Sequence, residues 1–264
     1  MRTDFQTLKL ETIDGHMLLV TLNRPEVANA FNTQMARDLY ELFAALRIDA
    51  EDVRCILLTG AGGRAFCAGG DLKERNGMSD EVWAKQHALF EQAFYAIMDC
   101  PVPIVAAVNG AAYAGGCELV LASDFAYAAA TARFALTETS LGIMPGVGGT
   151  QNLPRAVGLR RAKEIILTAR PFSAEEALAW GMVNKVVAPE ALMAEATAAA
   201  RAICANAPIA VRQAKRAMNA GFDVDLKTAL AIEVEAYNRM VPTEDRLEGI
   251  RAFNEKRKPQ FKGR

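Results

Sequence analysis

The hydrophobic positions along the chain follow two different periods, which predict strands and helices in turn. Residues 17–23, 53–59 and 104–108 are short apolar runs typical of strands. Residues 32–47 and 80–98 instead carry apolar side chains three and four positions apart, which is the spacing of an amphipathic helix. This alternation predicts an α/β fold in which helices pack on a largely parallel sheet.

The second half of the chain becomes mainly helical. Short strands are expected at residues 125–128, 133–136 and 183–187, and helices at residues 189–205, 208–220 and 225–241. Ser173 and Glu176 have the spacing of a helix-capping box ahead of an apolar stretch. The last helices carry apolar faces that must be buried, either against the same chain or against another subunit.

The composition excludes several classes of protein. Of the 264 residues, 52% are apolar, which is enough for a sizeable core and too much for a disordered chain. The 30 basic and 31 acidic side chains nearly cancel, which argues against a surface built to hold nucleic acid or an anionic membrane. Residues 100–117 form the longest uncharged apolar stretch, but its prolines and glycines favour a strand, a turn and a helix start over a membrane span.

The cysteines and histidines argue against several further kinds of site. Five scattered cysteines without a C-x-x-C pair disfavour a disulfide framework or a zinc site and favour a reducing compartment. The first residues carry no targeting signal, so we expect a cytoplasmic protein. His16 and His87 are the only histidines, and neither G-x-S-x-G nor H-E-x-x-H occurs, which argues against serine-hydrolase and zinc-protease chemistry.

One candidate site lies where a buried strand leads through small residues into Gly115 and Gly116. A helix is expected to begin there, and its first amides lack partners within the helix, so they can face an oxyanion. Glu118 falls in the first turn and can face the same cavity. The alternative is a tight packing turn in which Glu118 only stabilises the start of the helix.

A second candidate is the glycine-rich loop at residues 60–70. Gly60 to Ala65 matches a loose dinucleotide-binding fingerprint, but Gly69 and Gly70 follow too soon for the helix that such a site requires. We therefore interpret the loop as exposed backbone whose amides near Gly69 and Gly70 face a ligand.

The third candidate is Glu138, an isolated acid in an otherwise uncharged stretch. Burial would raise the pKa of its carboxyl, although a surface or helix-capping glutamate fits the pattern equally well. Two backbone amides that converge on one oxygen form an oxyanion hole, and two glutamates can act as acid and base. This set suits chemistry next to a thioester carbonyl, where negative charge builds on the oxygen.

Several ordered motifs resemble the enoyl-CoA hydratase/isomerase (crotonase) family over nearly the whole chain. They are Leu22-Asn-Arg-Pro25, Ala65-Phe-Cys-Ala-Gly-Gly-Asp-Leu72, Val108-Asn-Gly110, Gly115-Gly-Cys-Glu118 and residues 142–151. The resemblance implies a spiral of β-β-α turns over residues 1–195, followed by a helical oligomerisation region over residues 196–264. It also implies a homo-oligomer, either a trimer or a dimer of trimers.

The resemblance assigns roles to the candidate residues. It implies that the amides of Gly70 and Gly115 form the oxyanion hole and that Glu118 and Glu138 are the catalytic acids. Retention of both acids favours addition of water to a short-chain enoyl-CoA, with double-bond isomerisation or other enolate chemistry as the alternative. Which glutamate is the base stays open. Coenzyme A would be part of the substrate, and neither a cofactor nor a metal is implied.

The same resemblance implies where coenzyme A binds. It points to the backbone at Ala68, to the side chain of Lys73, and to Phe253 and Lys256 of a neighbouring subunit. The basic C-terminus would then contact phosphates, although a solvated tail is the simpler interpretation. Glu26 departs from the lysine that short-chain hydratases tend to carry near the coenzyme.

Within the family the chain most resembles the methylglutaconyl-CoA hydratase branch, which acts in leucine breakdown. A substrate of that kind carries a distal carboxylate, for which Arg75 is a weak candidate, because its charged neighbours favour a surface position. RNA binding in that branch relies on a lysine-rich first helix. Residues 32–52 contain two arginines and five acids, so we expect no nucleic-acid binding.

Overall fold

The computed structural model describes residues 2–264, which form two sheets surrounded by helices. The strands are β1 (Leu8–Ile13), β2 (Met17–Leu22), β3 (Cys55–Gly60), β4 (Ala65–Cys67), β5 (Ile104–Val108), β6 (Ala111–Tyr113), β7 (Phe125–Ala129), β8 (Arg133–Ala135), β9 (Phe172–Ser173) and β10 (Lys185–Val187). The α-helices are α1 (Thr33–Ile48), α2 (Leu72–Arg75), α3 (Asp80–Met98), α4 (Gly115–Ala122), α5 (Gly149–Val157), α6 (Leu159–Thr168), α7 (Ala174–Ala179), α8 (Leu192–Cys204), α9 (Pro208–Phe222), α10 (Leu226–Asn238) and α11 (Glu244–Asn254). Short 3-10 helices are η1 (Pro25–Val27), η2 (Glu138–Leu141) and η3 (Pro189–Ala191).

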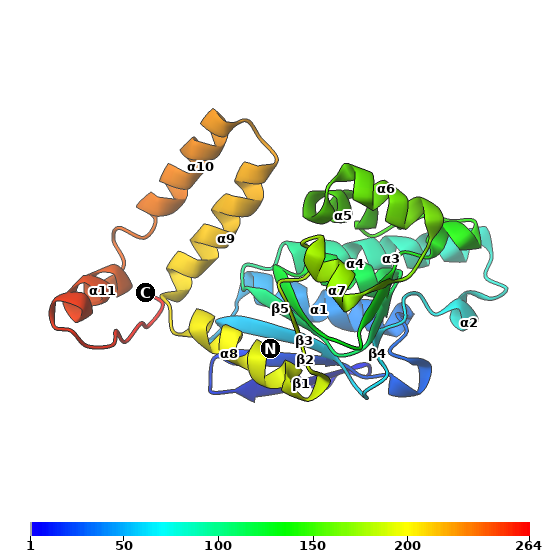
Figure 1. Ribbon diagram of the computed structural model, residues 1–264. Helices are drawn as coiled ribbons and strands as arrows, with labels where there is room; N and C mark the ends of the chain where they lie inside the picture. The colour runs from blue at the N-terminus through cyan, green and yellow to red at the C-terminus, as the bar shows by residue number, and fades with distance from the viewer. Residues whose placement is uncertain (1) are drawn as a thin grey trace.

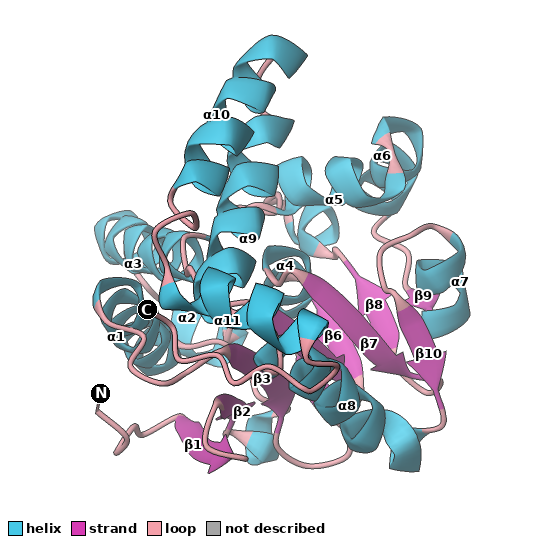
Figure 2. Ribbon diagram, turned by 90° about the vertical axis from the view of Figure 1, so that its left-hand side faces the viewer, coloured by secondary structure: helices cyan, strands magenta, loops and turns pink. Residues whose placement is uncertain are grey.

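The larger sheet has the strand order β1-β2-β3-β5-β7-β10 and is parallel apart from the β1–β2 hairpin. Its central strands β3, β5 and β7 are almost entirely apolar, as expected for strands that are covered on both faces. In β3, Ile56 and Leu58 face the core shared with α1 and α3, whereas Cys55 and Leu57 face α8. Figure 2 shows α8 crossing the sheet on that second face. The predicted α/β fold is confirmed.

The smaller sheet has the order β4-β6-β8-β9, and β4, β6 and β8 run parallel. Parallel strands place their carboxyl ends at the same edge, so the loops that follow them lie together. Gly70 follows β4, Gly115 and Glu118 follow β6, and Glu138 follows β8. This short sheet therefore gathers residues from three distant parts of the sequence.

The sequence analysis missed several elements. β1, β4, β6, β9 and α11 were not predicted, and the loop at residues 60–70 contains β4. Three of these strands have two or three residues, which is too short for any periodicity to show. The predicted helix at 189–205 divides into η3 and α8, and the other predicted helices agree to within a few residues.

The apolar stretch at residues 100–117 forms the expected strand (β5), turn and first turn of α4, with the unpredicted strand β6 between the turn and the helix. Its central part is fully buried in the protein core. Within residues 2–264, no helix is both long enough and apolar enough to cross a membrane.

The C-terminal helices differ from the rest of the chain. α8 runs through the predicted boundary between residues 195 and 196, while α9 and α10 form a hairpin that projects from the body in Figure 1. α9 is fixed to the sheet by Lys215, whose Nζ donates to Asp124 at 2.7 Å and to the carbonyl of Val102 at 3.1 Å. The division into two regions remains a prediction.

Large apolar side chains on α9, α10, α11 and the segments between these helices stay exposed. They are Met218, Phe222, Val224, Leu226, Leu230, Val234, Tyr237, Val241, Leu247, Ile250 and Phe253. A single chain therefore does not bury the apolar faces of its own last helices.

Candidate active site

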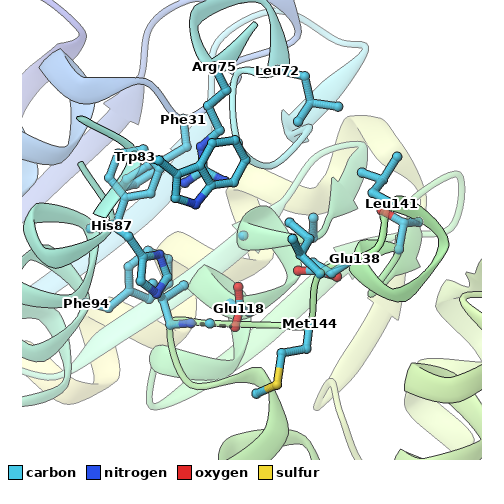
Figure 3. Close-up of a pocket in the computed structure, with 18 of the residues that line it drawn as sticks. Phe31, Leu72, Arg75, Trp83, His87, Phe94, Glu118, Glu138, Leu141 and Met144 are labelled. Carbon is cyan, nitrogen blue, oxygen red and sulfur yellow. Dashed lines mark hydrogen bonds between the residues drawn. The ribbon is translucent and has the colours of Figure 1, made fainter. Parts of the chain in front are cut away.

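A cavity of about 670 Å³ opens at the carboxyl ends of β4, β6 and β8. Gly70, Gly115, Glu118 and Glu138 all line it, so the structure brings together the four residues predicted to act on the substrate. Figure 3 shows the two glutamates facing the same hollow. Most of the remaining wall is apolar, which would strengthen any electrostatic interaction inside it.

The amides of Gly70 and Gly115 lie close together at one side of this cavity. A Cβ built on Gly115 would stand 4.0 Å from the nitrogen of Gly70. Neither N–H has a hydrogen-bond partner among the described residues, since the backbone bonds around them use Gly69, Phe31 and Asp71. Two free donors side by side can hold one oxygen that gains negative charge.

The approach of these two loops depends on small residues. Gly69 has a φ of +91°, and a Cβ there would come within 2.7 Å of the Cβ of Ala114 and 2.8 Å of the Tyr113 carbonyl. Ala114 itself has a φ of +48°, which is unfavourable for alanine, and its N–H donates to the carbonyl of Ala135 at 2.8 Å. That strained residue leads directly into the free amide of Gly115.

Glu118 is 2% exposed and sits in the first turn of α4. Its Oε1 accepts hydrogen bonds from the amides of Gly149 at 2.7 Å and Val147 at 3.0 Å. Burial raises the pKa of Glu118 above its ordinary value, and these two bonds oppose the rise without cancelling it, because they stabilise the ionised carboxylate. The loop thus favours the charged form of an otherwise desolvated acid.

The glycines of the 145–149 loop have a role that the sequence did not reveal. The sequence analysis placed this stretch only within the family motif at residues 142–151. A Cβ on Gly149 would lie 2.9 Å from Glu118 Oε1 and 2.8 Å from the Cβ of Pro145. Glycine is therefore required at position 149 so that the backbone can approach the carboxylate.

Glu138 opens η2 and is 6% exposed. Its Oε2 is buried and has no hydrogen-bond partner among the described residues. Burial raises the pKa of Glu138 to about 7, and the neighbouring charge of Glu118 adds to the rise. Near neutral pH this carboxyl can hold a proton and release it.

The residues predicted to bind coenzyme A fall in different places. Ala68 lines the main cavity, and Lys73 lines a shallower adjoining hollow with Glu26. Phe253 is 83% exposed at the end of α11, and Lys256 follows that helix, away from the cavity of the same chain. Their expected role in a neighbouring subunit stays a prediction.

Other cavity residues were missed because no local motif marks them. Trp83, His87 and Phe94 come from one face of α3, and Ile143 and Met144 come from the loop after η2. The three- and four-residue spacing on α3 was read only as a core-facing helix. Part of that face instead lines the cavity.

Arg75 also lines the cavity, so the surface position that its charged neighbours favoured is wrong. Its side chain is half-buried and lies over the ring of Trp83, with the guanidinium carbon 4.2 Å from the ring centre. Neighbours in sequence did not reveal this contact because Trp83 belongs to the next helix.

The thiols of this chain are unbonded and mostly buried. Burial raises the pKa of Cys67 to about 12 and that of Cys100 to about 11, so both remain protonated thiols. In residues 2–264, no three histidine, cysteine or acidic side chains are grouped so that they could hold a metal ion.

Comparison with known proteins agrees with this geometry. The enoyl-CoA hydratase/isomerase family model matches residues 12–264. The chain is 42% identical to a short-chain-enoyl-CoA hydratase of Clostridium acetobutylicum (95% of this chain, 96% of that protein). It is 40% identical to the human mitochondrial methylglutaconyl-CoA hydratase (96% of this chain, 76% of that protein).

A solved structure shows the same fold. The crystal structure of an enoyl-CoA hydratase from Bacillus anthracis superposes with a TM-score of 0.96 at 44% identity, covering 98% of this chain and 100% of the other. The α/β architecture predicted from the sequence is thus the crotonase fold. The family match and these relatives together show that the chain belongs to the enoyl-CoA hydratase/isomerase family.

Proposed function

We propose that this protein is an enoyl-CoA hydratase that adds water across the 2,3 double bond of a short-chain enoyl-CoA. The observation that carries the proposal is one cavity with two free amides and two buried glutamates in different surroundings. The names of the relatives support the same reaction class.

The amides of Gly70 and Gly115 would bind the thioester oxygen. They stabilise it as negative charge develops, because their N–H dipoles are already oriented and need no rearrangement. Polarisation of the carbonyl makes C3 of the conjugated double bond electron-poor. The oxyanion hole therefore favours attack by water at C3.

Glu118 is the better base of the two acids. Its two amide donors favour the ionised carboxylate, which can accept a proton from water as the oxygen bonds to C3. The electron pair of the double bond then moves onto the thioester oxygen as an enolate. No cofactor enters this step, since coenzyme A is carried by the substrate.

Glu138 is the better acid. With a pKa near 7 and no donor to its Oε2, it can hold a proton and deliver it to C2 as the enolate collapses. The sum of the two steps adds one water and leaves a 3-hydroxyacyl-CoA. Two carboxyls of one type thus take opposite roles through their surroundings.

We propose that coenzyme A extends from the cavity past Ala68 and Lys73. The hollow beside Lys73 continues from the oxyanion loop through Gly70, and the lysine would pair with a phosphate. Phe253 and Lys256 would complete this region from a neighbouring copy.

The homo-oligomer that we propose, a trimer or a dimer of trimers, would bury the exposed apolar side chains of α9 to α11. Sedimentation equilibrium of the purified protein tests this assembly. A mass of three or six chains supports it, and a stable monomer overturns it.

The test of the reaction uses crotonyl-CoA and purified protein. We expect loss of the conjugated enoyl-thioester absorbance together with a product heavier by one water. Isomerisation of a 3-enoyl-CoA without any water addition would instead favour the double-bond isomerase. Absence of turnover on every enoyl-CoA, together with retention on RNA, would replace the proposal with a non-catalytic role.

A further inference from the structure

Two segments far apart in the sequence meet behind the oxyanion amide of Gly70. Residues 28–31 run alongside residues 68–71, and Phe31 and Gly70 form a parallel bridge between them. Figure 3 shows Phe31 on the wall of the cavity. The proposed mechanism gives residues 28–31 no task, although they follow directly after the motif Leu22-Asn-Arg-Pro25.

The bridge decides which way the Gly70 N–H points. The N–H of Phe31 donates to the carbonyl of Gly69 at 2.7 Å, and the carbonyl of Phe31 accepts from the amide of Asp71 at 2.9 Å. Because the peptide bond between Gly69 and Gly70 is trans, the N–H of Gly70 points opposite to the Gly69 carbonyl. It therefore points away from Phe31 and is left free for a ligand.

One arginine nitrogen joins the two segments beside this bridge. Nη1 of Arg24 donates to the carbonyl of Ala30 at 2.6 Å and to Oδ2 of Asp71 at 3.0 Å. Ala30 precedes Phe31 and Asp71 follows Gly70, so the arginine contacts a neighbour of each member of the bridge. The two hydrogens of Nη1 lie in one plane at a fixed angle, so they set the spacing between the segments.

Asp71 connects this arginine contact to the helix that follows. Its Oδ1 accepts from the amides of Lys73 at 3.1 Å and Glu74 at 3.3 Å, in the first turn of α2. Both carboxylate oxygens are therefore occupied, and the Asp71 amide belongs to the bridge with Phe31. Gly70 has no side chain to restrict its backbone, so the direction of its N–H depends on these neighbouring bonds.

The arginine is itself anchored to the smaller sheet. The fully buried Asn29 accepts from the Arg24 amide at 3.0 Å through Oδ1, and its Nδ2 donates to the carbonyl of Ala65 in β4 at 2.9 Å. The side chains of Arg24 and Asp71 are only 18% and 11% exposed. Burial costs both charges their water, so such a pair adds little net stability and is better explained by the geometry that it fixes.

We propose that Arg24 and Asp71 are positioning residues for the oxyanion hole, and that their ion pair keeps the Gly70 N–H aimed at the thioester oxygen. The inference rests on the proposed hydratase function, because that function gives the Gly70 amide its role. A hydrogen bond weakens steeply when its donor turns away, so a small rotation of this peptide lowers the stabilisation of the enolate. Neither Arg24 nor Asp71 lines the main cavity, so both act through Gly70.

The experiment observes the thioester carbonyl directly. Butanoyl-CoA labelled with carbon-13 at that carbonyl has no double bond to hydrate, so it stays intact in the complex. A donor aimed at the carbonyl oxygen draws electrons from the carbon and moves its NMR signal downfield of the free position. This shift is measured at saturation, and kcat and KM for hydration of crotonyl-CoA are measured in parallel.

Four variants test the ion pair: Arg24→Met, Arg24→Lys, Asp71→Asn and the double variant Arg24→Met/Asp71→Asn. Asp71→Asn removes the charge but keeps an oxygen for the amides of α2. Arg24→Met and Asp71→Asn should each lose most of the downfield shift and lower kcat by about 10- to 100-fold, with a much smaller change in KM. Arg24→Lys should fall between the wild type and Arg24→Met. The double variant should be no worse than Arg24→Met, because the two residues act as one unit.

The matched control is Asp124→Asn. Asp124 also forms a largely buried ion pair, with Lys215 at 2.7 Å, and its Oδ2 also accepts from a backbone amide, that of Ile104. These bonds lead to α9 and β5 and not to the segments that carry Gly70. Asp124→Asn should therefore lose stability in denaturant unfolding but keep the wild-type carbonyl shift and kcat.

The outcomes separate positioning from the other roles of an ion pair. Loss of both the shift and kcat in Asp71→Asn, with Asp124→Asn unchanged, supports the inference. A folded Asp71→Asn that keeps both wild-type values overturns it, as does a rise in KM alone, which would assign the pair to coenzyme binding. An equal loss in Asp124→Asn also overturns it, because general destabilisation then explains the result.

The wild type separates this inference from the proposed function. A wild type that moves the butanoyl-CoA signal downfield but does not hydrate crotonyl-CoA contradicts the hydratase function and leaves the positioning test in force. A wild type that binds butanoyl-CoA without any downfield shift overturns the inference, because the Gly70 N–H is then not aimed at the oxygen.

Discussion

The two walls of the cavity hold the same type of side chain in opposite surroundings. On the α4 side, Glu118 accepts two backbone hydrogen bonds from the 145–149 loop. On the η2 side, Glu138 is also buried but has no donor to its Oε2 in the described part of the chain. Burial raises the pKa of both carboxyls; two amides of the neighbouring loop oppose the rise at Glu118, whereas at Glu138 only a backbone hydrogen bond within the residue itself does.

In the proposed mechanism, backbone placement rather than residue type separates the acid from the base. Two glutamates alone do not define a direction for proton transfer. The glycine-rich loop beside Glu118 would define that direction. Its amides stabilise the charged carboxylate of Glu118 and leave Oε2 of Glu138 without a donor. The predictions below test this difference, from the largest expected effect to the smallest.

Removal of either acid should have the largest effect. Glu118→Gln and Glu138→Gln should each lower kcat for hydration of crotonyl-CoA by about 10²- to 10⁴-fold, because each deletes one proton transfer. Steady-state kinetics and far-UV circular dichroism, measured together, separate lost chemistry from lost fold. Either variant working near the wild-type rate with an intact fold would refute the assigned roles.

Displacement of the amides beside Glu118 should have the next largest effect. A Cβ in Gly149→Ala would stand 2.9 Å from Glu118 Oε1, so the loop must shift and weaken both bonds to the carboxylate. We expect kcat/KM to fall by about 10- to 100-fold. Gly63→Ala is the matched control, since a Cβ there meets nothing within 4 Å. Equal rates for the two variants would contradict a role for the loop.

The pH dependence should follow the Glu138 proton. Because burial raises the pKa of Glu138 to about 7, the acid is protonated below that pH and progressively ionised above it. For hydration, kcat/KM should therefore fall about tenfold for each pH unit above about 7. A profile that rises through this range would reverse the acid and base assignments.

The smallest expected effect is on the stability of Glu138→Gln, which should rise although the activity of this variant falls. The pKa of Glu138 rises from 4.5 to about 7 on folding, so the native state binds the extra proton and stability falls as pH rises through that window. Glu138→Gln should then be more stable than the wild type by roughly 1–3 kcal/mol at about pH 8. Denaturant unfolding at equal protein concentration measures the difference, which should shrink toward about pH 5. A stability difference that does not change with pH would show that burial of the Glu138 charge is not its cause.

Much of the fold could be predicted from the sequence, because long elements carry periodic patterns. The apolar runs of β3 and β5 and the amphipathic helices α1 and α3 follow such patterns directly. The hairpin partner β1 was missed although Leu8 and Leu10 alternate with polar residues, since that signal is weak for an edge strand.

The site was only partly predictable, for a physical reason. Glycine-rich motifs marked Gly70, Gly115 and Glu118, and Glu138 stood out as an isolated acid in an uncharged stretch. The amides that hold Glu118 and the stacking of Arg75 on Trp83 join segments by tertiary packing. No spacing in the chain reveals such a contact, and charged sequence neighbours placed Arg75 on the surface.

The protonation state of Glu138 tests the account most directly. Carbon-13 NMR of protein labelled at the glutamate carboxyls, with Glu138→Gln to assign the signal, follows its titration in the resting enzyme. The account predicts a Glu138 signal that titrates near pH 7 while the Glu118 signal is that of a carboxylate at that pH. A Glu138 signal already ionised at about pH 5, or a Glu118 that holds the proton at neutral pH, would contradict it.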